Sequence, residues 1–155
     1  TWLPAWRPRA RIKEVQHPKF FLFDPGVARG LAGRLREPPS DTERGPLLET
    51  LVLHELRAAI AYQNLGGNLS YWRTPSGTEV DFVWERGDKR IGIEVKASKR
   101  WRSEYGSALA DLKKEGRITA AFGVYAGNER QRERELTVLP FAEFTRDLTA
   151  GKVLA

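Results

Sequence analysis

Cysteine and methionine are both absent from the 155-residue chain, and histidine occurs only at His17 and His54. The lack of cysteine excludes disulfides, thiolate metal sites and cysteine nucleophiles, and two histidines are too few for a histidine-rich zinc site. Any bound metal would therefore be held mainly by oxygen ligands, which favours Mg²⁺, Mn²⁺ or Ca²⁺. Because the chain begins at Thr1 and has no methionine, we expect it to be a piece of a longer polypeptide.

Long apolar runs are missing as well. No stretch approaches the roughly 18 residues that indicate a membrane span, and no signal-peptide pattern opens the chain. We therefore expect a cytoplasmic protein without membrane contact. Hydrophobic residues make up 41% and charged residues 30% of the chain, an ordinary balance for one globular domain with a core.

Positive charge dominates among the charged residues. The formal net charge is +6, which suits a polyanionic partner such as DNA. Much of it lies in one stretch that Trp101 interrupts: Lys89, Arg90, Lys96, Lys99, Arg100 and Arg102. This stretch indicates either a nucleic-acid backbone contact with an aromatic ring for stacking or a solvated loop after a strand.

Hydrophobic periodicity predicts the order of the elements. Residues 1–18 have no clear period and are interpreted as a linker or arm from an upstream domain, whereas 19–155 form the domain itself. We expect a strand at 19–23, a short helix at 25–35, an exposed loop at 37–46, a long helix at 47–63, strands at 69–73, 78–85 and 90–97, a helix at 103–115, a strand at 118–125, a solvated turn at 127–135, a strand at 136–139 and a helix at 140–148. The predicted fold class is α/β: an antiparallel meander plus a right-handed parallel crossover in one mixed sheet flanked by helices.

Glu49 lies within the apolar stripe of the predicted long helix. At about 100° per residue, its position falls among Val52, Leu53, Leu56 and Ile60. A carboxylate facing a core is costly unless it is paired or binds a metal, although compensation of the helix dipole in the first turn is a competing explanation. We favour a functional site because this helix precedes strands that carry further acids.

Two triplets on neighbouring predicted strands contain these acids, Glu79-Val80-Asp81 and Glu94-Val95-Lys96. Strand alternation puts the two charged residues of the second triplet on one face, about 6.6 Å apart. It puts Asp81 opposite an apolar face formed by Val80, Phe82 and Trp84. Half-buried acids on adjacent strands repel unless a positive group lies between them, and a divalent cation or Lys96 would serve. An amphipathic hairpin with a solvated charged face is the alternative.

Taken together, Glu49, Glu79–Val83 and Ile93–Lys96 resemble the PD-(D/E)XK nuclease superfamily, with Val80 in place of the proline. The chain more closely resembles the DUF4143 domain, which typically forms the C-terminal part of bacterial and archaeal AAA+ family ATPases. The matching segments are 19–24, 45–56, 72–74, 77–83 and 93–96. The resemblance implies a restriction-endonuclease-like fold and an upstream ATPase domain in the same polypeptide. The chain itself contains no P-loop motif.

The resemblance also implies roles for individual residues. Asp81, Glu94, the Val95 carbonyl and Glu49 would hold Mg²⁺ or Mn²⁺, and Lys96 would orient or help to deprotonate the attacking water. The catalytic set would be Lys96, Glu94, Asp81 and Glu49, acting on DNA as a metal-dependent endonuclease. The alternatives are a catalytically silent DNA-binding or regulatory module of the ATPase and, by analogy alone, a protein-interaction domain.

Overall fold

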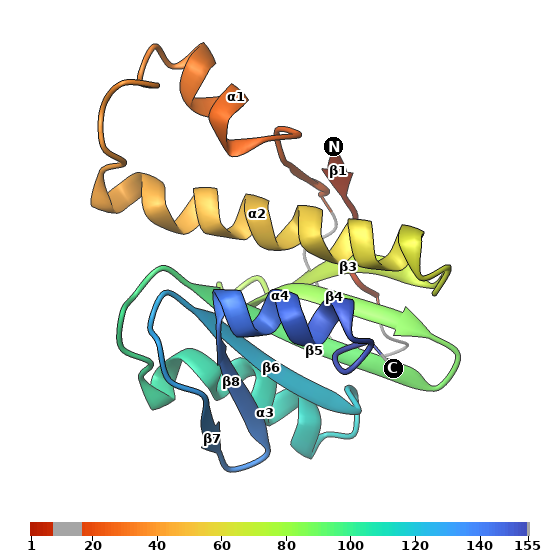
Figure 1. Cartoon of the computed structure of the whole chain (residues 1–155). Helices are drawn as coiled ribbons and strands as arrows, with labels where there is room; N and C mark the ends of the chain where they lie inside the picture. Colours follow the sequence, from red (N-terminus) through yellow and green to blue (C-terminus); the bar gives the residue numbers. More distant parts are fainter. Residues whose placement is uncertain (8–16, 155) are drawn as a thin grey trace.

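The computed structural model describes residues 1–7 and 17–154 and contains helices on both faces of a central sheet (Figure 1). The helices are α1 (Pro25–Leu31), α2 (Asp41–Tyr62), the 3₁₀ turn η1 (Ser103–Gly106), α3 (Ser107–Lys114) and α4 (Phe141–Thr149). The strands are β1 (Trp2–Leu3), β2 (Lys19–Phe20), β3 (Asn68–Arg73), β4 (Glu79–Arg86), β5 (Lys89–Lys96), β6 (Ala120–Tyr125), β7 (Gln131–Glu133) and β8 (Leu136–Pro140). Among the described helices, none combines the length and apolarity needed to cross a membrane.

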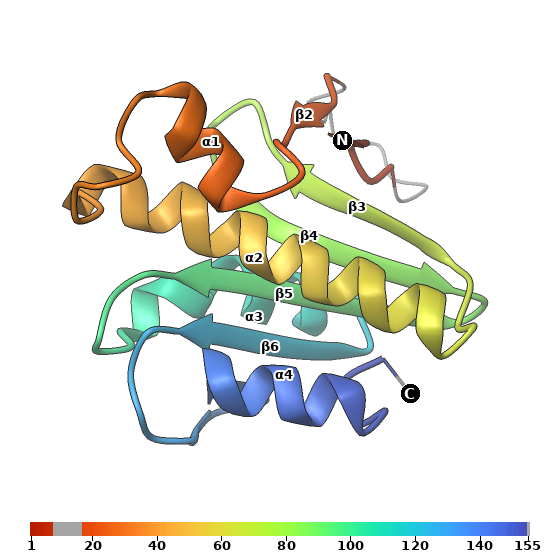
Figure 2. The same ribbon diagram turned by 45° about the horizontal axis from the view of Figure 1, so that its top comes forward.

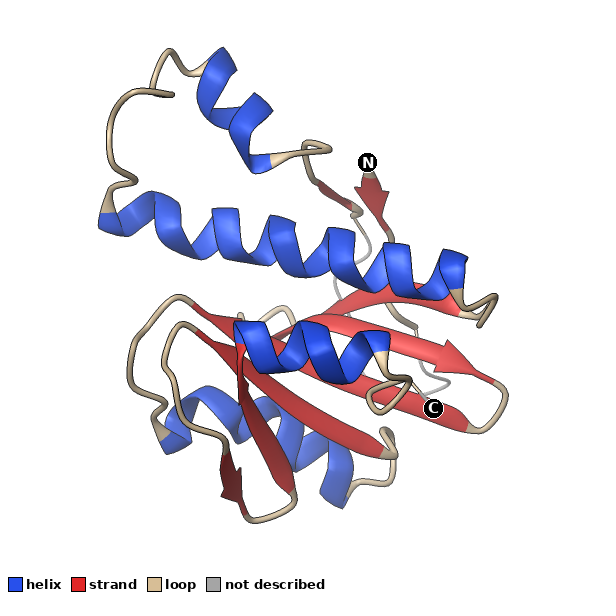
Figure 3. Ribbon diagram, viewed as in Figure 1, coloured by secondary structure: helices blue, strands red, loops and turns tan. Residues whose placement is uncertain are grey.

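Six strands form one mixed sheet in the order β3-β4-β5-β6-β8-β7 (Figure 3). β3, β4 and β5 pair antiparallel, whereas β6 is parallel to both β5 and β8. The predicted meander and parallel crossover are therefore confirmed, as is the mixed α/β class. β7 pairs antiparallel with β8, so the solvated turn predicted at 127–135 is wrong in part. The strand covers the edge of β8 with polar residues, which is how sheets protect an edge.

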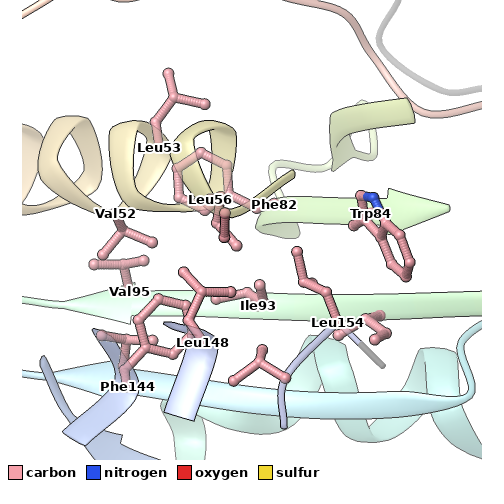
Figure 4. Close-up of a cluster of buried hydrophobic side chains, with 14 of the residues drawn as sticks. Val52, Leu53, Leu56, Phe82, Trp84, Ile93, Val95, Phe144, Leu148 and Leu154 are labelled. Atoms are coloured by element: carbon pink, nitrogen blue, oxygen red, sulfur yellow. The ribbon is translucent and has the colours of Figure 1, made fainter. Parts of the chain in front are cut away.

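Two hydrophobic layers hold the helices to the sheet. α2 and α4 lie on one face, and α3 lies on the other (Figures 1 and 2). The first layer includes Val52, Leu53 and Leu56 of α2, Phe144 and Leu148 of α4, and Phe82, Trp84, Ile93 and Val95 of the sheet (Figure 4). The second layer, beneath α3, includes Trp72, Val80, Val83, Leu109, Leu112 and Val138. Both faces of β4 and β5 are thus buried, and polar residues on these strands are costly unless they are satisfied.

α2 begins six residues earlier than predicted. The loop expected at 37–46 is confirmed for 37–40 and wrong from Asp41 onward. The Glu43 carboxylate accepts hydrogen bonds from the backbone N–H and the hydroxyl of Ser40, at 2.9 and 2.8 Å. Together with the approach of the Ser40 side chain to the Glu43 backbone N–H, these contacts form a capping box at the helix N-terminus. Pro46 lies inside the helix, so the Gly45-Pro46 pair that indicated a loop does not end it.

A β-bulge in β4 changes which side chains share a face. Ser70 pairs with Val83 and Trp72 pairs with Val80. Two residues of β4, Asp81 and Phe82, therefore lie opposite one residue of β3, Tyr71. Val80 consequently packs beneath α3 with Val83. The prediction that Val80 shares a face with Phe82 and Trp84 is wrong, because simple alternation does not survive an inserted residue.

The N-terminal segment covers the outer edge of β3. Tyr71 donates its N–H to the Pro4 carbonyl at 3.0 Å and accepts the Trp6 N–H at 2.6 Å. Leu3 joins the hydrophobic layer beneath α2, and Trp6 joins the layer beneath α3. Of the predicted arm 1–18, residues 8–16 lie outside the described residues. The two-stranded pairing of β1 with β2 continues this segment toward α1.

Candidate metal centre at the diverging ends of two strands

The candidate site lies where β4 and β5 stop pairing. Their last backbone pair on this side joins Phe82 to Ile93. Beyond it, Asp81 Oδ2 accepts the Val95 N–H at 2.8 Å, so a carboxylate replaces the carbonyl that a regular ladder would supply. The bulge in β4 allows this exchange. Asp81 is only 6% exposed, and the hydrogen bond from the Val95 N–H holds its carboxylate against the backbone of the neighbouring strand.

Glu94 is paired through only one of its two carboxylate oxygens. It is 6% exposed, and its Oε1 forms a short hydrogen bond and ion pair with the Lys96 ammonium. Its Oε2 is buried without a hydrogen-bond partner. Buried polar atoms in folded proteins are nearly always satisfied, so this oxygen is an acceptor left open for a donor or a cation.

Glu49 approaches the same acids from α2. It is half-buried, and burial raises its pKa to about 7, with a further increase from the Asp81 charge. The ammonium groups of Lys19 and Lys96 oppose this increase. Three carboxylates from three elements thus interact electrostatically, and the structure brings all four residues predicted for catalysis into one region.

Burial controls the ionisation of the two strand acids. It raises the pKa of Glu94 to about 8, with the Asp81 charge adding to the shift. It also raises the pKa of Asp81, against the hydrogen bond from Val95 and the charge of Lys96. Burial alone would lower the pKa of Lys96, but the Glu94 carboxylate and the other two acids outweigh it and raise that pKa. Lys96 is accordingly a cation at neutral pH.

The donor set fits a hard divalent cation that keeps part of its water shell. Asp81 and Glu94 offer two carboxylates, but within residues 1–7 and 17–154 no group of three or more histidine or acidic side chains is already spaced to hold an ion. Mg²⁺ commonly uses one or two carboxylates and retains several waters. The side chain of Val95, whose carbonyl was predicted as a ligand, packs in the core beneath α2.

A second lysine at the site was missed by the sequence analysis. Lys19 of β2 forms a short ion pair with Glu79, and its ammonium lies 4.9 Å from the centroid of the Tyr71 ring. Glu79 also pairs with Arg73 at 3.5 Å. No periodic signal could identify Lys19, because its place depends on the pairing of β2 with β1.

Trp101 is half-buried and packs against neighbouring residues, and its availability for stacking stays a prediction. Its ring fills the space over Gly123, where an added Cβ would lie 2.5 Å from the indole. Its Nε1 donates to Glu133 Oε2 at 3.2 Å, and its ring meets Tyr105 edge-on. The exposed cations of this loop are Lys99, Arg100 and Arg102. Lys89, at the other end of β5, is separate from them.

Two comparisons with known proteins bear on the identity of the chain. No curated protein gives a significant match. The family model DUF4143, described as a domain of unknown function, matches residues 44–144. This range includes most of α2, the meander, α3 and the start of α4, and every acid of the candidate site. Because the match covers more than half of the 155 residues, the chain belongs to the DUF4143 family.

Proposed function

We propose that this domain is a nuclease that cleaves phosphodiester bonds of DNA with Mg²⁺ or Mn²⁺. The observation that carries the proposal is the buried, unpartnered Oε2 of Glu94, beside Asp81 and Lys96. A purely structural hairpin gains nothing from two adjacent buried acids, because each raises the cost of ionising the other. Strongly shifted carboxylates held by a rigid strand pair are typical of functional sites.

The order of elements supports the same proposal. A helix carrying Glu49 precedes an antiparallel meander carrying Asp81 and Glu94, and a helix then leads to a parallel strand. This is the arrangement that a restriction-endonuclease-like fold would have. The net charge of +6 favours association with DNA. Since DUF4143 domains typically form the C-terminal part of AAA+ family ATPases, the domain would work beside an AAA+ ATPase domain of the same polypeptide.

The chain's own residues would divide the work. Asp81 is held by the Val95 N–H and presents its remaining oxygen, and Glu94 presents Oε2. These two carboxylates would hold a divalent cation, which would supply stabilisation of the charge that develops on the phosphate and acidification of a water. Lys96 is positioned by Glu94 Oε1 and would stabilise the phosphate as a cation. Since its pKa is raised, it is a poor proton acceptor in the arrangement described.

The direct test is Mg²⁺- or Mn²⁺-dependent cutting of single-stranded, duplex and branched DNA. Asp81→Asn and Lys96→Met should reduce cutting at least 100-fold, since each removes one member of the site while preserving its volume. The matched controls are Asp88→Asn and Lys89→Met, exposed residues near the opposite end of the same hairpin. Equal cutting by the wild type and by the Asp81 and Lys96 variants would trace the activity to a contaminant and refute the proposal.

A catalytically silent DNA-binding module is the second candidate. The observation that favours it is the lack, within the described residues, of three acids or histidines already spaced around an ion. Titration calorimetry separates the two. Mg²⁺ or Mn²⁺ binding that is lost in Asp81→Asn supports the nuclease, whereas DNA binding without any metal binding supports the module.

A further inference from the structure

A cation outside the predicted site motif lies beside its acids. Lys19 belongs to β2, which precedes the family-matched range 44–144. Its ammonium forms an ion pair with Glu79, which lies two residues before Asp81 on β4. Lys19 therefore lies next to the strand segment that carries an acid of the candidate site. It reaches this strand from a segment that no part of the acid-and-lysine pattern includes.

The position of Lys19 is fixed by the segment that carries it. Tyr71 of β3 donates its hydroxyl hydrogen to the His17 carbonyl, and the Lys19 ammonium lies over the same Tyr71 ring at 4.9 Å. Leu3, which pairs with Lys19 across the two-stranded ribbon, is buried in the layer beneath α2. The ribbon thus turns Lys19 toward the sheet rather than toward solvent.

The partner of Lys19 does not depend on it alone. Glu79 also pairs with the Arg73 guanidinium at 3.5 Å, so Glu79 keeps a counter-ion when Lys19 moves away. The Lys19 side chain retains 24% exposure, so part of it is accessible to a ligand. Lys19 lies near acids, is partly accessible, and shares its partner Glu79 with a second cation. A lysine in this position is suited to exchange one anionic partner for another.

We propose that Lys19 contacts a substrate phosphate at the candidate site, as a second cation beside Lys96. This inference rests on the proposed function for its substrate class, and it assigns to the β1–β2 ribbon a direct part in binding DNA. Lys19 would exchange Glu79 for the phosphate while Arg73 retains Glu79. The exchange would move the ammonium that lies over the Tyr71 ring, while the backbone of β2 stays paired with β1.

The test measures duplex DNA binding in EDTA by fluorescence anisotropy, from 50 to 200 mM salt, so that the readout is independent of cutting. Loss of one phosphate contact lowers the slope of log affinity against log salt by about 0.9. For Lys19→Met we expect that change, which makes the variant's affinity about 3.5-fold less sensitive to salt over this range. Lys19→Arg should restore the wild-type slope, and Lys114→Met, at an exposed lysine of α3 outside the basic stretch, should leave it unchanged.

The double variant Lys19→Met/Glu79→Gln distinguishes contact with phosphate from mere pairing with Glu79. If Lys19 only neutralises Glu79, removing both partners restores the wild-type slope, and the inference is overturned. If Lys19 contacts phosphate, the slope stays reduced. Wild-type binding whose slope is unchanged in Lys19→Met overturns the inference while the nuclease proposal stands. A reduced slope without any metal-dependent cutting supports the inference and removes the nuclease proposal. No DNA binding by the wild type overturns the inference, and observed cutting would then still uphold the nuclease.

Discussion

Replacing Glu94 by glutamine should change how the stability of the metal-free protein depends on pH. Burial, reinforced by the Asp81 charge, raises the pKa of Glu94 from 4.5 to about 8. Between these values the folded protein holds a proton that the unfolded chain has released. The stability that this proton contributes is fully present below pH 4.5 and is lost as pH rises through 8. Glutamine stays neutral throughout, so Glu94→Gln should escape this loss.

The magnitude follows from the same shift. At about 1.4 kcal/mol for each tenfold change in proton affinity, the upper limit is about 5 kcal/mol at pH 9. Water entry and local relaxation around an ionised carboxylate reduce such penalties, so we expect Glu94→Gln to exceed the wild type by about 2–3 kcal/mol at pH 9. Near pH 4.5 the two proteins should differ least, because protonated Glu94 and glutamine are alike in charge and shape.

Urea denaturation followed by tryptophan fluorescence, in EDTA at pH 5, 7 and 9, measures this difference. Asp88→Asn, in the exposed turn between β4 and β5, is the control for removal of a surface carboxylate. A free-energy difference between Glu94→Gln and the wild type that stays constant from pH 5 to pH 9 would refute the reasoning. It would mean that water or Lys96 fully offsets the free-energy cost of ionising Glu94 in the folded protein.

Three further predictions follow from the described contacts. Mg²⁺ at 100 times its dissociation constant should stabilise the wild type by about 2.7 kcal/mol in thermal melts and leave Asp81→Asn unaffected; stabilisation of both proteins would place the ion elsewhere. Gly123→Ala should cost about 1–3 kcal/mol in urea denaturation, because its Cβ would lie 2.5 Å from the Trp101 ring; an unchanged midpoint would contradict this packing. Trp101→Phe should lower the thermal midpoint but change DNA affinity less than about twofold, since stacking on a base is worth about 1–3 kcal/mol and this ring is packed against Gly123. A larger loss of affinity would show that the ring contacts DNA.

The features predicted correctly depend on short-range patterns. The strand patterns at 69–73, 78–85 and 90–97, with compact turns between them, were enough to predict the antiparallel meander. The helical composition of 103–115 before an apolar run was enough to predict a parallel crossover, which the pairing of β5 with β6 confirms. The acid on α2 was located by helical periodicity alone. The meander and the α2 pattern depend on neighbours within one helix or across one turn, whereas the crossover strands β5 and β6 are joined through α3.

The wrong predictions depend on contacts between distant segments or on competing local signals. The bulge at Asp81 and Phe82 is defined by the register of β3, which the sequence of β4 does not contain. Trp101 is half-buried and packs against Gly123 on another strand, a contact that its basic neighbours in the sequence do not indicate. The start of α2 was predicted too late for a different reason. Gly45 and Pro46 indicated a loop, and this outweighed the capping signal of Ser40 and Glu43 in the same sequence.

The bulge in β4, which interrupts the simple alternation of side chains between the two faces of the sheet, also forms part of the candidate site. In a regular strand pair, Asp81 would project from one face of the sheet and the Val95 N–H would bond to a backbone carbonyl. The extra residue instead lets the Asp81 carboxylate take that hydrogen bond, beside Glu94 and within electrostatic reach of Glu49 on α2. The acids are thus concentrated at the cost of stability at neutral pH, and Lys96 and Lys19 compensate only part of their charge. A fold selected for stability alone would have no reason to keep Glu94 Oε2 buried and unpartnered, whereas a site that binds a cation needs such an oxygen.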